Sequence, residues 1–89
     1  MFTWINKQGV RSSEGFEVQS TGRFTMEYRE GNLRLTVDVE HGGNGSIGFD
    51  PSCFRRWLNS VEPRSSAAQE RMIQNFLAAL EFQGLRGER

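Results

Sequence analysis

Cys53 and His41 are the residues of this 89-residue chain that most resemble a nucleophile and its base, and each is the single residue of its type. Cys53 closely follows Asp50-Pro51 and is expected in the first turn of a helix, where the helix dipole favours a thiolate. Nothing in the sequence places His41 within reach of that thiol, and a lone cysteine usually behaves as a small buried hydrophobic residue. The pair does not predict catalysis, so we expect no enzyme.

Two further patterns predict neither a metal nor a cofactor. One cysteine and one histidine form no zinc-ligand set, and a single cysteine excludes an internal disulfide. The glycine-rich run at residues 42–46 resembles a phosphate-binding loop in composition only. Such a loop requires a following Gly-Lys-Ser/Thr and a helix, whereas a strand is expected here. We interpret the run as a hairpin connection.

Acidic side chains are expected on the polar face of one hairpin. Glu27, Asp38 and Glu40 alternate with apolar residues, so they project from one side of the predicted strands. They could form an acidic binding surface or a carboxylate pair for acid–base chemistry. Charges on the outer face of a strand are more often simply solvated.

Arg55 and Arg56 stand beside Trp57, and aromatic rings interleaved with arginine are typical of single-strand nucleic-acid binding. Trp57 also falls on one apolar stripe with Phe54, which favours a place in the core. The charge balance opposes nucleic-acid binding, because eleven basic residues are matched by eleven acidic ones. No export signal and no long apolar segment is visible, so a cytoplasmic location without membrane contact is expected.

The elements that must position these residues begin with a β-hairpin at residues 24–40, where apolar and polar residues alternate on both sides of a Gly-Asn turn. Its apolar side chains are predicted to face one core. They are Phe24, Met26, Tyr28, Leu33, Leu35, Val37 and Val39. Short strands are predicted at residues 2–5, 10–12, 16–20, 23–29, 33–40 and 46–49. Their connections are too short for parallel crossovers, so the strands are expected to be antiparallel.

At Asp50-Pro51 the apolar period changes from two to 3.6, which predicts a short helix ending near Ser60. Ser66, with Gln69 three residues later, forms a capping-box pattern that begins a second helix. Its apolar stripe contains Met72, Ile73, Phe76, Leu77 and Leu80. Gly84 is the predicted C-terminal stop, and residues 86–89 are expected to form a frayed tail.

Strands followed by helices predict a single α+β domain over residues 1–85. We expect a strongly twisted antiparallel sheet of five to six short strands, then a short helix and a C-terminal amphipathic helix packed on the sheet. A sheet this short could stay open or curl into a partly open, Sm-like barrel, and the pattern does not choose between them.

An ordered series of residues resembles a known family. It runs Tyr28-x-Glu30-Gly31, Leu35-x-Val37-Asp38-x-Glu40, Phe49, Trp57, Arg71-x-Ile73, Ala79-Leu80 and Gly84. The series, over about residues 22–85, is similar to the small immunity-protein family numbered seventy-four of bacterial polymorphic-toxin systems. The resemblance implies a non-enzymatic cytoplasmic inhibitor that binds a cognate toxin domain, with Tyr28, Glu30, Glu40 and Trp57 facing the partner. Asp38 joins this predicted surface from the acidic face described above.

A second interpretation comes from another class of protein. A compact set of strongly bent strands also resembles Sm-like RNA-binding barrels, which would imply RNA contact through loops and assembly, such as a homodimer, through edge strands. An inhibitor of a nucleic-acid-cutting toxin should show a coherent acidic face. An RNA-binding protein should instead bring together Arg11, Arg23, Arg55 and Arg56.

Overall fold

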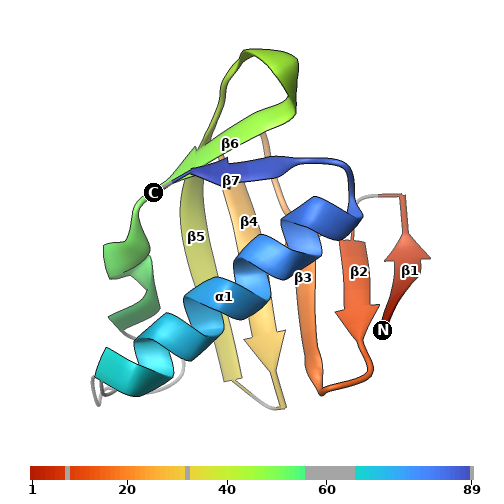
Figure 1. The fold of residues 1–89 in the computed structure, drawn as a ribbon, viewed down its shortest axis with the longest axis vertical. Helices are drawn as coiled ribbons and strands as arrows, with labels where there is room; N and C mark the ends of the chain where they lie inside the picture. Colours follow the sequence, from red (N-terminus) through yellow and green to blue (C-terminus); the bar gives the residue numbers. More distant parts are fainter. Residues whose placement is uncertain (8, 32, 56–65, 89) are drawn as a thin grey trace.

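The computed structural model describes residues 1–7, 9–31, 33–55 and 66–88. One α-helix crosses a curled sheet whose strands follow the order of the chain (Figure 1). The strands are β1 (Phe2–Asn6), β2 (Gly9–Ser12), β3 (Phe16–Ser20), β4 (Thr25–Glu30), β5 (Leu33–His41), β6 (Ser46–Phe49) and β7 (Arg86–Glu88). The helices are α1 (Ser66–Phe82) and two short 3₁₀ segments, η1 (Gly43–Gly45) and η2 (Pro51–Arg55). The predicted α+β class is confirmed.

The central hairpin β4–β5 has the predicted alternation. Met26 is paired with Val37, and Tyr28 with Leu35, and all four side chains are buried on the side of the sheet that faces α1. Phe24 is an exception, because its ring is 61% exposed. The residue precedes β4, and only its backbone carbonyl joins the sheet, where it accepts a hydrogen bond from the Val39 N–H at 2.9 Å.

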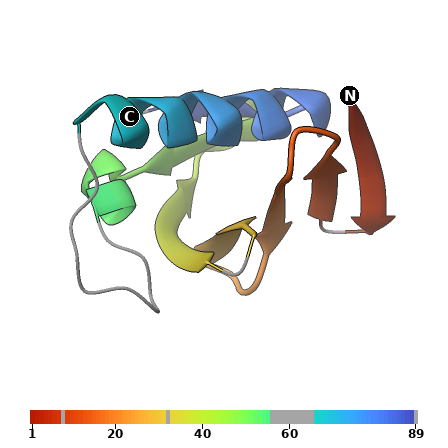
Figure 2. The same cartoon turned by 90° about the horizontal axis from the view of Figure 1, so that it is seen from below.

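Strand β5 decides the shape of the sheet because it pairs with different neighbours along its length. Its first part pairs with β4 as far as Asp38, and its last three residues, from Val39 to His41, pair with β6. The strand therefore bends from one part of the sheet into the other. Figure 2 shows the result, a half-barrel that curls beneath the helix. A partly open barrel was one of the two expected shapes.

Helix α1 begins at Ser66 and ends in the predicted glycine stop. Gly84 has a φ of +81°, a left-handed conformation that glycine adopts without strain. The Leu85 N–H donates to the Leu80 carbonyl at 2.9 Å, and the Gly84 N–H donates to the Glu81 carbonyl at 3.0 Å. These two bonds form a Schellman motif, which satisfies the last carbonyls and turns the chain back toward the sheet.

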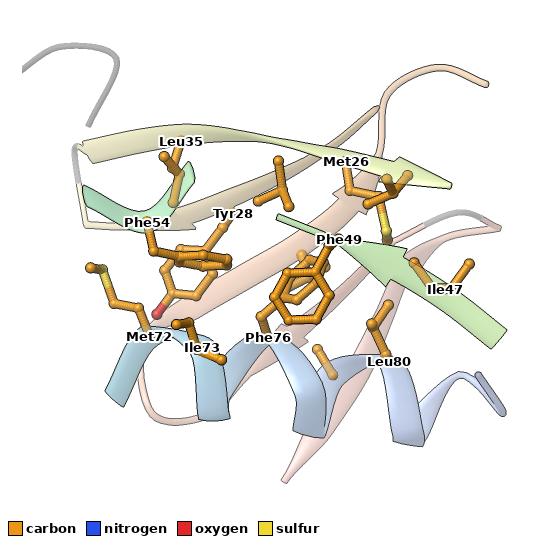
Figure 3. Close-up of a cluster of buried hydrophobic side chains, with 14 of the residues drawn as sticks. Met26, Tyr28, Leu35, Ile47, Phe49, Phe54, Met72, Ile73, Phe76 and Leu80 are labelled. Carbon is orange, nitrogen blue, oxygen red and sulfur yellow. The ribbon is translucent and has the colours of Figure 1, made fainter. Parts of the chain in front are cut away.

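The core lies between α1 and the concave face of the sheet, and aromatic rings form its centre (Figure 3). Phe76 of α1 packs edge-to-face on Phe49 of β6 and Phe54 of η2, with centroids 4.9 and 5.5 Å apart. Tyr28 continues the cluster from Phe54 to Phe16 of β3. Such offset and T-shaped pairs add stabilisation beyond the area that they bury.

Sequence predictions for two further parts of the chain require correction. The predicted helix from Asp50 is a 3₁₀ helix over Pro51–Arg55, and its expected continuation toward Ser60 lies outside the described residues. The Asp50 side chain accepts a hydrogen bond from the Ser52 N–H at 2.9 Å, as expected of a capping residue.

The second correction concerns the expected frayed tail at residues 86–89 and the expectation of antiparallel pairing throughout. Arg86–Glu88 form β7, which pairs in parallel with β6. The intervening chain contains α1 and is long enough for a parallel crossover. Gly87 allows the strand to lie close to the helix, since a Cβ there would clash with Leu77 Cδ2 and come within 3.0 Å of Leu80 Cδ1.

We expect Gly87→Ala to destabilise the protein by about 1–3 kcal/mol, because the new methyl group must displace packed leucine side chains. Urea unfolding measures this change in free energy. Gly43→Ala is the matched control, because its Cβ would meet nothing within 4 Å. We expect the control to stay within about 0.5 kcal/mol of the parent protein. Equal stability of the two variants would show that β7 is not packed against α1 in solution.

Candidate functional site

A polar cluster connects β4 to α1 at the edge of the core. The Tyr28 hydroxyl donates to Glu30 Oε1 at 2.8 Å and accepts from Asn75 Nδ2 at 3.0 Å. The Arg71 guanidinium donates to both carboxylate oxygens of Glu30, at 3.2 and 3.0 Å. This two-bond geometry is stronger and more directional than a single contact. The cluster therefore sets the position of the helix on the strand.

The protonation of this cluster indicates a structural role. Burial raises the pKa of the Tyr28 hydroxyl; the Asn75 hydrogen bond lowers it, and the hydrogen bond and charge of Glu30 raise it. The hydrogen bond to Glu30 likewise raises the pKa of Arg71. Tyr28 therefore stays neutral and Arg71 stays charged over the physiological range, so neither group can exchange a proton near neutral pH.

Two residues of the predicted partner-facing surface, Tyr28 and Glu30, belong to this polar cluster instead. The ring of Tyr28 is fully buried, so its expected place on such a surface is wrong. The carboxylate of Glu30 is partly exposed but engaged by Arg71. Trp57 lies outside the described residues. The alternation of the hairpin also predicted that Tyr28 faces the core, and this prediction is confirmed.

The other two predicted residues, Asp38 and Glu40, both lie on β5 and line one hollow on the outer face of the sheet. Glu40 of β5 is paired in register with Gly48 of β6, and Gly48 is paired with Glu88 of β7. Side chains in register on adjacent strands point to the same face. The carboxylates of Glu40 and Glu88 therefore lie on either side of Gly48, which has no side chain. The missing side chain of Gly48 leaves a hollow between them.

This hollow has a volume of about 560 Å³ and is also lined by Asp38 and by the exposed ring of Phe24. We call the surface formed by Phe24, Asp38, Glu40, Gly48 and Glu88 the acidic hollow. A smaller hollow of about 210 Å³ continues from it past Glu40 and Glu88 to His41. The Arg23 guanidinium lies over the Phe24 ring, 5.6 Å from its centroid, and thus stands beside the acidic hollow.

The acidic hollow has a net negative charge. Within the described ranges, no ion pair is found for Asp38 or Glu40, whereas Glu88 pairs with Arg86 at 3.3 Å. Both partners of that pair are more than half exposed, so the pair is weak. Glu27, the third acid of the predicted face, is instead paired with Arg29 at 3.6 Å.

Sequence reasoning missed Glu88, because residues 86–89 were expected to form a frayed tail. A signal was present. Leu85 and Gly87 alternate with the charged residues Arg86 and Glu88, and this period of two is typical of a strand with one buried face. The strand has three residues, which are too few to distinguish this period from chance, so the signal is weak.

The remaining candidates show no catalytic arrangement. Cys53 packs against the core from η2, and no hydrogen bond joins it to His41 among the residues that the structure describes. The run at residues 42–46 forms a hairpin connection, in which the Ser46 hydroxyl donates to the Gly43 carbonyl at 3.1 Å. No group of His, Cys, Asp and Glu that could hold a metal ion is present in the described ranges.

The arginines predicted for RNA contact are engaged elsewhere where they can be seen. Arg11 pairs with Glu17 at 3.0 Å across β2 and β3, and Arg23 stacks on Phe24. The side chains of Arg55 and Arg56 are outside the described residues. As for membranes, none of the described helices has the length and apolar character needed to span one.

We expect the single tyrosine of the chain to ionise well above its ordinary pKa of about 10 while the protein is folded. Because the pKa of Tyr28 is higher in the folded protein than in the unfolded chain, the contribution of neutral Tyr28 to the free energy of unfolding is fully present below pH 10. This contribution is lost as pH rises through the folded-state pKa. Tyrosinate absorbance and urea unfolding measured against pH test both statements. Ionisation of the folded protein near pH 10 would contradict them.

Tyr28→Phe is the control for this titration. It removes the ionising group and one partner each of Glu30 and Asn75, so it should cost about 1–2 kcal/mol at neutral pH. We expect the variant to lose less stability than the parent protein as pH rises above 10.

No family model matches the chain, and neither the curated proteins nor the solved structures contain a significant match to it. The geometry of its own residues is therefore the basis for assigning a function.

Proposed function

We propose that this protein is a non-enzymatic binding protein that neutralises a toxin domain by direct protein–protein contact in the cytoplasm. The observation that supports the proposal is the acidic hollow, which is lined by three carboxylates and an exposed aromatic ring. The resemblance of the chain to an immunity-protein family points to the same kind of function.

The charge of the acidic hollow fits a basic partner. A toxin that cleaves nucleic acid needs basic side chains to bind phosphate, and carboxylates of an inhibitor can occupy those side chains. Asp38, Glu40 and Glu88 would provide such carboxylates from two strands. Complementary charge also accelerates association, which suits a protein that must intercept a toxin quickly.

Shape supports the same partner. The space above Gly48 is open to solvent and could receive an arginine or lysine side chain between Glu40 and Glu88. The exposed Phe24 ring offers apolar surface beside those charges, and aromatic residues are enriched at the centres of protein interfaces. In such a side chain, the carboxylates can contact the charged group and the aromatic ring can contact the methylene groups.

The backbone that carries the charges of this surface is held by secondary structure. Asp38 and Glu40 lie on β5, between β4 and β6, and Glu88 lies on β7. A site whose backbone is fixed by strand pairing loses less conformational entropy on binding than one formed by loops. The acidic hollow therefore has the character of a preorganised surface.

The test is capture of partners from the native host by tagged protein at moderate salt, with protein and nucleic acid both analysed. We expect recovery of the C-terminal domain of a large secreted protein. Glu40→Arg should reduce this recovery at least about tenfold, because it places a like charge against a basic partner.

Glu14→Arg is the matched control, because this exposed glutamate lies in the β2–β3 turn and makes the same change in net charge. We expect it to capture as much toxin domain as the parent protein. Recovery of RNA without a protein partner would overturn the proposal in favour of RNA binding. Equal loss in both variants would show that net charge, and not the acidic hollow, determines binding.

A further inference from the structure

The two edges of the sheet differ in a way that matters for assembly. Strand β7 at one edge is short and has charged residues, Arg86 and Glu88, on either side of Gly87. Shortness and charge are the usual means by which a protein prevents pairing at an exposed edge. Strand β1 at the other edge has five residues, FTWIN, and none of them is charged. The register of β1 against β2 shifts only beyond Trp4, so of these two edges the one at Phe2–Trp4 is chemically open to another strand.

The backbone groups that β1 presents to solvent follow from its pairing with β2. The Ser13 N–H donates to the Met1 carbonyl at 2.9 Å, which marks a hydrogen-bonded position next to the Phe2–Ser12 pair. Hydrogen-bonded and non-hydrogen-bonded pairs alternate in an antiparallel ladder. Thr3 therefore points its N–H and carbonyl toward β2, and Phe2 and Trp4 point theirs outward.

The side chains of the same residues form an exposed aromatic surface with the end of the helix. Phe82 of α1 lies 5.4 Å from the ring of Phe2 and 5.9 Å from that of Trp4, measured between centroids. Trp4 is 48% exposed and Phe82 is 44% exposed. We call Phe2, Trp4 and Phe82 the aromatic edge. Figure 2 shows β1 at the end of the sheet remote from η2.

We propose that the aromatic edge binds a second copy of this chain, and that the two β1 strands pair antiparallel about a two-fold axis at Thr3. In this register Phe2 of each copy lies opposite Trp4 of the other, and each such pair exchanges two backbone hydrogen bonds. The two Thr3 side chains meet at the axis on the opposite face. The two sheets then form one continuous sheet.

Self-complementarity identifies a second copy as the occupant. Rings meet rings on one face and threonine meets threonine on the other, and both combinations are favourable cross-strand pairs. No charge of β1 requires an opposite charge in a partner or is opposed by its own symmetry mate. The neighbouring outer-face charges Arg11 and Glu17 already neutralise each other at 3.0 Å.

The available area indicates a weak, reversible dimer. The exposed halves of Trp4 and Phe82 each amount to roughly 100 Å². With the strand backbone, the total for two copies falls below the roughly 1,200 Å² of a standard stable interface. We therefore expect a dissociation constant on the order of micromolar. The acidic hollow and the aromatic edge have no residue in common, so the proposed dimer does not depend on the proposed function.

A charge-swap experiment tests the proposed register. Thr3 is exposed, so Thr3→Lys and Thr3→Glu should both fold normally, and circular dichroism with urea unfolding checks this. Each variant alone would place like charges roughly 5 Å apart at the axis, so sedimentation velocity should show dimerisation weakened at least about tenfold. An equimolar mixture of the two variants should dimerise at least as well as the parent protein, because the opposed charges then attract.

Thr36→Lys is the matched control, since Thr36 lies on β5 in the interior of the sheet, and it should dimerise like the parent protein. Three results of this charge-swap experiment would overturn the proposal. The first is a parent protein that stays monomeric at roughly 1 mM, which is well above the expected dissociation constant. The second is a dimer that persists in each single variant. The third is an equimolar mixture of the two variants that stays monomeric while the parent protein dimerises. Binding of a different protein to β1, in preference to a second copy of this chain, would also overturn the proposal.

Discussion

The packing of one face of α1 against the concave side of the sheet is the interaction on which the rest of the structure depends. Phe76 is fully buried at its centre and contacts the rings of Phe49 and Phe54, which come from two different elements. A sheet of short strands with one apolar face needs such a cover, because burial of that face is the main favourable term in folding. The bend of β5 lets β6 and η2 reach the same helix.

Polar contacts then select one position of the helix among the many that apolar packing would allow. The hydrogen bonds that Asn75 and Arg71 donate to Tyr28 and Glu30 are directional, so they favour a single rotation and translation of α1 on the strands. At the other end, the left-handed Gly84 reverses the chain toward β6. These two constraints together determine where β7 is placed.

The acidic hollow is a consequence of that placement. Asp38 and Glu40 point outward because their apolar neighbours on β5 point into the core, and this follows from the geometry of a strand. Glu88 reaches the same face only because β7 pairs with β6 in the observed register. The outer face of β5 to β7 and the uncharged edge at β1 lie at different ends of the sheet order, so the proposed partner and the proposed second copy would contact different residues.

Most strands and the main helix could be predicted from local patterns. Period-two alternation located β4 and β5, and the 3.6-residue stripe from Met72 to Leu80 together with Gly84 located α1 and its end. Strand β7 could not be predicted this way. A three-residue strand carries too little periodicity, and it forms because Gly87 fits against a distant helix. Residue types and their order thus determined the elements and their apolar faces, because these depend on neighbours along the chain. Which carboxylates share a surface was decided by strand pairing between segments far apart in the chain, which only the folded structure contains.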